Sequence, residues 1–181
     1  GVRAQDATRP FDMQIHKNNM SQPEIPAFIE RFAAMLDTYP GSFTVAEVGG
    51  PAPIGEMKAF TEGDTRLDSA YNFDFLYAPD LTPRRIKDSI NQWDQSETEG
   101  WPSWAFSNHD APRCITRWAP HDQLDDYARM IMMLLLSLRG NPIIYQGEEL
   151  ALPQANVAYE HLKDPEAIIN WPKTLGRDGA R

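Results

Sequence analysis

The chain has 181 residues, of which 41% are hydrophobic and 24% are charged, and its formal net charge is −9 at pH 7. This length allows one ordinary domain but falls short of the roughly 250 residues of a complete eight-unit (β/α) barrel. The acidic balance, without a basic cluster, excludes nucleic acid and anionic membranes as expected partners, and no stretch approaches the ~20 apolar residues of a membrane helix.

The first part of the chain is predicted to pass from loop to helix to strand. Residues 1–22 are polar and lack periodicity, which is typical of a loop. A helix is predicted from Pro23, with apolar residues at helical spacing as far as Leu36 and with Ser21 as its N-cap. A short strand of the buried type follows over residues 42–48.

The later elements continue this alternation. Helices are predicted at 57–60, from Thr82-Pro83 onward, and over 123–139 with Asp122 as N-cap. Three more strands are predicted from aromatic and apolar runs, at 70–76, 104–107 and 143–146. The tail from Leu152 to Arg181 has little periodicity and is expected to be a long loop beside the strand ends. Regular alternation of strands and helices predicts an α/β fold with a parallel sheet or barrel.

Cysteine and histidine usage limits the chemistry further. The single cysteine, Cys114, excludes an internal disulfide and is compatible with a reducing compartment, so we expect a cytoplasmic protein. Three histidines, His16, His121 and His161, lack metal-ligand spacing with one another. We therefore expect no metal and no cofactor.

Carboxylates follow two of the predicted strands. Glu47 ends the apolar run of FTVAEVGG, and Asp110 follows that of WAFSNHDAPR. Because (β/α) barrels carry their chemistry at the carboxyl ends of the strands, this pattern predicts acid/base groups at one mouth of a barrel. Two carboxylates that flank one bond are also the working parts of a glycosidase.

Each of these groups has a functional and a structural interpretation. Glu47 at an apolar rim would be partly desolvated, which favours the protonated form and suits a general acid, or it is a surface residue at a strand end. Asp110 could stabilise an oxocarbenium charge while His109 and Asn108 bind sugar hydroxyls, or the triple is an Asx-type helix cap. Residues 145–149 again place polar and acidic groups after a predicted strand. The structural alternative there is a glycine turn with charges that cap a helix.

These segments together resemble the α-amylase family of retaining glycoside hydrolases, in its α-glucosidase branch. The resemblance spans nearly the whole chain and rests on FTVAEVGG, YNFDFLY, GWPSWAFSNHDAPR, LLLSLRGNPIIYQGEELALP and DPEAIINWPKTLGRDGAR. It implies a partial (β/α)8 TIM barrel, with residues 1–181 forming strands five to eight and their helices, the C-terminal part of one catalytic domain. The implied substrate is a small oligosaccharide or α-glucoside.

The resemblance also implies roles for single residues. Glu47 would be the general acid/base, Asp110 the carboxylate that stabilises the transition state, and His109 and Asn108 would bind the sugar. Arg181 matches the arginine of the family's GRDG-x-R segment, which helps to close the glucose pocket. The family's nucleophile is the Asp of a G-x-R-x-D stretch, and here Asp6 comes one place too late. We therefore expect the nucleophile upstream of this sequence and an isolated chain that is inactive.

Other functions stay open at this point. A transglycosylase of the same family has the same residues as a hydrolase. A non-catalytic relative, serving as a binding or structural subunit, would be expected to lack Glu47 or Asp110, and both are present. An unrelated α/β protein is the third possibility. The presence of G-x-R-x-D after a strand, upstream of Gly1, would discriminate best among them.

Overall fold

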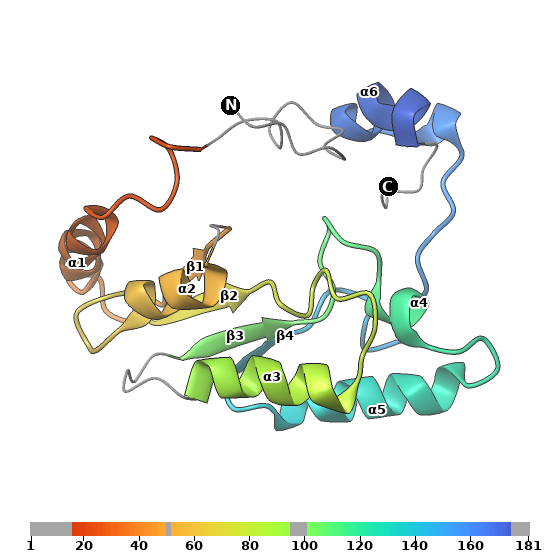
Figure 1. Cartoon of the computed structure of the whole chain (residues 1–181), viewed down its shortest axis with the longest axis horizontal. Helices are drawn as coiled ribbons and strands as arrows, with labels where there is room; N and C mark the ends of the chain where they lie inside the picture. The colour runs from red at the N-terminus through yellow and green to blue at the C-terminus, as the bar shows by residue number, and fades with distance from the viewer. Residues whose placement is uncertain (1–15, 50–51, 95–100, 175–181) are drawn as a thin grey trace. The chain divides into compact units, whose positions relative to one another are not determined.

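The computed structural model describes residues 16–49, 52–94 and 101–174. These residues fall into two compact units, one made of residues 21–153 and the other of residues 1–20 together with 154–181. The larger unit contains the whole sheet (Figure 1). The two units are described separately below.

The larger unit is built on a four-stranded sheet in which every pairing is parallel. The strands follow the chain order across the sheet: β1 (Val45–Glu47), β2 (Ser69–Asn72), β3 (Pro102–Ala105) and β4 (Asn141–Ile143). Parallel neighbours need a long crossover connection, and helices occupy the stretches between the strands. The prediction of an α/β fold with a parallel sheet is therefore confirmed.

The predicted helices are present, but the short helix over Cys114–Trp118 was not predicted and two predicted caps are wrong. The N-cap of the first helix is Glu24, and the Ser21 hydroxyl instead donates a 2.6 Å hydrogen bond to Glu56, so the predicted Ser21 cap is wrong. Gln123, rather than the predicted Asp122, stands at the N-cap of the helix before β4. The helices of this unit are α1 (Ile25–Leu36), α2 (Pro53–Thr61), α3 (Pro83–Asp94), α4 (Cys114–Trp118) and α5 (Leu124–Ser137).

One face of the sheet packs against helices. Side chains alternate between the faces of a strand, so Ala46 and Ala70 lie on one face in register and bury themselves with Met57 of α2. Trp104 of β3 packs in a second cluster with Leu135 of α5. Figure 1 shows α3 and α5 along the same side of the sheet. The opposite face is thereby left to Glu47, Tyr71 and Ser103, which are also in register.

The smaller unit contains two helical elements where a long loop was predicted. They are a 3-10 helix (Tyr159–His161) and α6 (Pro165–Thr174). The carboxylate of Asp164 accepts a 2.7 Å hydrogen bond from the backbone N–H of Ala167, which satisfies a free donor at the start of α6. An Asp-Pro pair is a recognisable sign of a helix start. The prediction of a loop was wrong because it relied on periodicity alone and did not use this sign.

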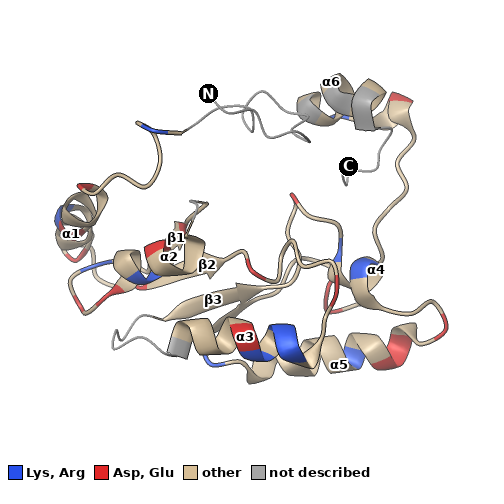
Figure 2. Ribbon diagram, in the orientation of Figure 1, with Lys and Arg blue, Asp and Glu red and all other residues tan. Residues whose placement is uncertain are grey.

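The outer surface of the helices is mixed in charge. Figure 2 shows stretches of acidic and of basic residues along the ribbons of α3 and α5. None of the helices within the described ranges is long and apolar enough to cross a lipid bilayer.

Candidate active site

The carboxyl ends of all four strands lie at one edge of the sheet, because the strands run parallel. Glu47 is the last residue of β1 and pairs in register with Tyr71 of β2. Residues that pair in register on parallel strands point to the same face. The two side chains therefore share the face that the helices leave open.

A cavity of about 350 Å³ lies beside this edge. It brings together Glu47, Asn108 and His109, three of the residues singled out from the sequence. Asp110 follows His109 in the chain but does not line the cavity. The other lining residues come from the same strand ends: Val45, Ala46, Tyr71, Ser107, Ile143, Ile144 and Tyr145.

Asp110 lies farther from its strand than the sequence indicated. The predicted strand at 104–107 ended directly before Asn108, whereas β3 ends at Ala105. In addition, β2 lies between β1 and β3, so Glu47 and Asp110 follow strands that are not neighbours. Asp110 therefore lies on a loop, five residues beyond the last residue of β3.

The side chain of Tyr71 reports the electrostatics of this region. Its pKa is raised from 10.0 to about 12, first by burial, then by the charge of Glu47, followed by Glu148, Tyr77 and Asp110. Burial and nearby negative charge both disfavour the phenolate, so Tyr71 keeps its proton at neutral pH and can donate a hydrogen bond beside Glu47.

The residues after β3 form a turn held by Asn108. Its side-chain oxygen accepts hydrogen bonds from the backbone N–H groups of Asp110 and Ala111, both at 2.8 Å. This is an Asx-type turn and not the Asx-type helix cap considered from the sequence, because the N-cap of the next helix, α4, is Arg113. The turn exposes His109, whose Nε2 lies 3.5 Å from the Asp110 carboxylate. Asn108 thus shapes the loop that presents the other two residues.

Reasoning from sequence missed Tyr71 and considered Glu148 only as one of the charges of the segment 145–149. Tyr71 was recognised only as part of an aromatic strand, although its alternation with Ala70 could have placed it on the Glu47 face. Glu148 is buried, at 8% exposure, and accepts a hydrogen bond from the Ser107 hydroxyl. No signal in the sequence distinguishes it from the adjacent Glu149, which is exposed.

Parallel strands backed by helices, with carboxylates and a cavity at the carboxyl edge, are the arrangement of (β/α)-barrel enzymes, whose active sites occupy that edge. The family model described as "Alpha amylase, catalytic domain" matches residues 3–181. The chain therefore belongs to the alpha-amylase family of glycoside hydrolases, as the resemblance in its motifs predicted.

Curated relatives and solved structures agree with this assignment. A probable alpha-glucosidase of Rhizobium meliloti (strain 1021) is 41% identical over 177 residues, which are 97% of this chain and 32% of the relative. An oligo-1,6-glucosidase of Bacillus cereus is 27% identical over 163 residues, 82% of this chain and 28% of the relative. The chain thus spans about a third of the length of the curated relatives it matches.

Among solved structures, the trehalulose synthase of Pseudomonas mesoacidophila MX-45 matches with a TM-score of 0.71 and 21% identity, over 83% of this chain and 30% of that one. The trehalose-6-phosphate hydrolase of Bacillus licheniformis matches with a TM-score of 0.69 and 24% identity, over 88% and 31%. At these identities the likeness concerns the fold alone. Four parallel strands with their helices correspond to about a third of a family barrel domain.

Several predicted groups lie outside the described residues, namely Arg181 and the segment from Gly1 to Asp6. Within the described ranges, no group of three or more His, Cys, Asp and Glu side chains is arranged to hold a metal ion.

Proposed function

We propose that this chain is part of a retaining α-glucosidase and forms strands five to eight of its (β/α)8 catalytic barrel. The observation that carries the proposal is the cavity at the carboxyl edge, which Glu47 lines together with Asn108 and His109. Membership of the alpha-amylase family and 41% identity to a probable alpha-glucosidase support the reaction class. Residues 1–181 then belong to one catalytic domain.

In this proposal Glu47 is the general acid/base. It donates a proton to the glycosidic oxygen as the bond to the sugar breaks, and it later removes a proton from the water that attacks the glycosyl-enzyme. The covalent intermediate requires a carboxylate nucleophile, which we assign to residues that this sequence does not include. The isolated chain is then inactive.

Asp110 and its neighbours bind and stabilise the sugar. The negative charge of Asp110 favours the oxocarbenium character of the transition state, and its influence on Tyr71 supports a position near Glu47. His109 is exposed beside Asp110 and donates to sugar hydroxyls, as does the amide of Asn108. Arg181 helps to close the glucose pocket. The substrate is a small oligosaccharide or another α-glucoside.

A chimera tests this proposal. In it, the segment of the Rhizobium meliloti relative that this chain matches is replaced by the chain itself. The chimera is expected to release glucose from maltose with retention at the anomeric carbon, followed by proton NMR, whereas the 181-residue chain alone does not. Circular dichroism verifies that the chimera is folded. A folded chimera without turnover would refute the proposal.

Product analysis separates hydrolysis from transfer. With maltose at high concentration, a hydrolase yields glucose, whereas a transglycosylase of the same family yields longer or rearranged α-glucosides. Predominant transfer products would correct the proposal to the second activity. A chimera that binds maltose without any turnover would instead favour a non-catalytic barrel.

A further inference from the structure

A buried carboxylate, that of Glu148, lies between the loop that follows β3 and the loop that follows β4. We propose that Glu148 is a positioning residue that holds both ends of the loop carrying Asp110. The consequence for catalysis rests on the proposed function, because it requires the role assigned to Asp110. The contacts that Glu148 makes with Ser107 and Cys114, at the two ends of this loop, are called the clamp below.

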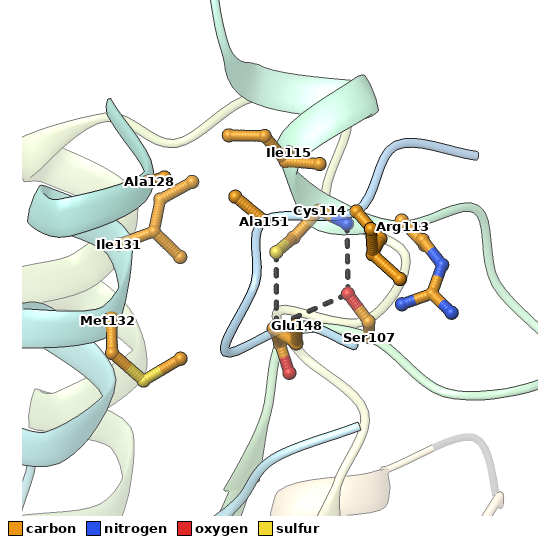
Figure 3. A pocket seen from close by; sticks show the side chains of 10 residues that line it. Ser107, Arg113, Cys114, Ile115, Ala128, Ile131, Met132, Glu148 and Ala151 are labelled. Carbon is orange, nitrogen blue, oxygen red and sulfur yellow. Dashed lines mark hydrogen bonds between the residues drawn. The ribbon is translucent and has the colours of Figure 1, made fainter. Parts of the chain in front are cut away.

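One oxygen of this carboxylate contacts both ends of the loop. Ser107 precedes residues 108–113 and Cys114 follows them. The Ser107 hydroxyl donates to Oε1 of Glu148 at 3.2 Å, and the Cys114 thiol donates to the same oxygen at 3.0 Å. The backbone N–H of Cys114 also donates to the Ser107 hydroxyl oxygen at 2.9 Å. Figure 3 shows the three groups converging on one another.

The other oxygen of the Glu148 carboxylate bonds to the backbone of the loop after β4, to which Glu148 itself belongs. Oε2 accepts a 2.9 Å hydrogen bond from the backbone N–H of Tyr145, a residue that lines the cavity. The turn that brings Glu148 inward favours glycine at position 147, because its φ of +82° lies in the left-handed region that other residues rarely adopt. The geometry therefore couples the loop after β3 to the loop after β4.

A second contact joins the same two loops. The guanidinium of Arg113 donates to the carbonyl oxygen of Gln146 at 2.9 Å and lies 4.8 Å from the ring centre of Tyr145. Arg113 belongs to the loop that carries Asp110. The loops after β3 and β4 are thus joined by the hydrogen bond of Arg113 at the surface and by the hydrogen bonds of Glu148 in the interior.

Three donors that point at one buried group need an acceptor, and a carboxylate accepts at both of its oxygens. Burial, followed by the charge of Glu148, raises the pKa of the Cys114 thiol to about 12, so the thiol keeps its proton and remains a donor. In Glu148→Gln one oxygen is replaced by an amide NH₂, which faces donors. A buried donor without an acceptor is costly, so the loop is expected to loosen.

Loosening of the loop acts on Asp110. The Asx-type turn orders the tip of the loop, but the ends of the loop determine where the tip lies. A misplacement of about 1 Å can lower a rate up to ~100-fold. Because Asp110 is proposed to act on the transition state, its displacement is expected to lower kcat and kcat/KM together and to leave KM unchanged.

Hydrogen exchange in the folded chimera tests the clamp without any need for turnover. In Glu148→Gln the amides of residues 107–114 are expected to exchange about 10-fold faster, because a lost hydrogen bond is worth roughly that factor. Glu149→Gln is the matched control and is expected to exchange like the wild type. Helix α1 is the internal reference for global unfolding. Wild-type exchange at residues 107–114 in Glu148→Gln would overturn the clamp.

A second variant keeps the test decisive if Glu148→Gln does not fold. Ser107→Ala keeps the carboxylate but removes a donor to it and the acceptor of the Cys114 N–H, so it should speed exchange in the same loop only. In the double variant the effects of Ser107→Ala and Glu148→Gln are expected to be less than additive, since both remove the hydrogen bond between Ser107 and Glu148. Full additivity, or an increase spread evenly over the chain in Ser107→Ala, would overturn the clamp.

Kinetics of the chimera test the consequence for catalysis. Glu148→Gln is expected to lower kcat for maltose up to ~100-fold with little change in KM, while Glu149→Gln keeps both. Faster loop exchange with an unchanged kcat would overturn the positioning role. If the chimera with Glu148 intact is folded and inactive, the proposed function fails, and hydrogen exchange still decides whether the clamp exists.

Discussion

Arg117 is expected to be a principal stabilising residue of the larger unit. Its guanidinium donates to four carbonyl oxygens from three segments: those of Phe75 and Ala78 after β2, of Phe106 after β3, and of Pro112 in the Asp110 loop. It also lies 4.5 Å from the ring centre of Trp118. Burial lowers the pKa of Arg117, which reflects the cost of placing a cation there. The change proposed is Arg117→Met.

The loss of stability in Arg117→Met depends on which carbonyl oxygens are left without a hydrogen-bond donor. The carbonyl of Phe75 also accepts from the N–H of Ala78, and the carbonyl of Ala78 accepts from the indole of Trp118, so both keep a hydrogen bond. The carbonyls of Phe106 and Pro112 lose the guanidinium. A hydrogen bond to a charged group contributes about 1.5–3 kcal/mol, and water recovers part of it at this half-buried position. We therefore expect a net loss of about 3 kcal/mol.

Urea titrations of the 181-residue chain, followed by circular dichroism, measure this loss. Arg129→Met is the matched control, because Arg129 is exposed and pairs with the exposed Asp126 across a helical turn. Such a surface pair contributes less than about 1 kcal/mol, so the control should unfold close to the wild type. If Arg117→Met and Arg129→Met had the same unfolding midpoint, the reasoning about the buried guanidinium would be refuted.

Four further predictions concern single positions. In the chimera, Glu47→Gln should lower turnover of maltose by about 10²–10⁴-fold and of 4-nitrophenyl α-glucoside less, because 4-nitrophenolate leaves without a proton; equal losses would contradict the acid role. Cys114 should react with a thiol reagent at pH 8 only after unfolding, since burial raises its pKa to about 12; rapid labelling of the folded chain would exclude this. Because the pKa of Tyr71 is raised from 10.0 to about 12, its contribution to stability is complete below pH 10 and is lost as pH rises through 12. In urea titrations, the free energy of unfolding of Tyr71→Phe should therefore fall less steeply with alkaline pH than that of the wild type; an equal fall would contradict this. Gly140→Ala should cost about 2 kcal/mol or more in urea titrations, because φ is +138° and the new Cβ would lie 2.6 Å from the carbonyl oxygen of Pro102; an unchanged midpoint would count against the close approach.

Local sequence patterns predicted the order of the main elements correctly. Apolar spacing located α1, α3 and α5, and apolar runs located all four strands to within a few residues. These signals are local, because helical and extended backbones each repeat with a fixed period. The predicted N-caps were wrong because the partner of a side chain can lie far away in the sequence. Ser21 found a partner in Glu56, 35 residues away, and local spacing contains no information about that contact.

The sequence by itself determined the family and the carboxylates worth considering, because motifs such as FTVAEVGG and SNHDAPR are specific in combination. It also predicted that Glu47 lies near the carboxyl end of a strand, and Glu47 is the last residue of β1. These properties depend on residue identity and on short-range periodicity. They therefore needed no knowledge of which segments meet in space.

Only the tertiary structure decided which of these groups lie together and which are buried. Glu148 and Glu149 are identical and adjacent, yet one is buried against Ser107 and Cys114 and the other is exposed. Tyr71 became part of the site because the register of β2 against β1 sets it beside Glu47. Burial and register depend on contacts between segments that are distant in the chain, and such contacts leave no pattern within either segment alone.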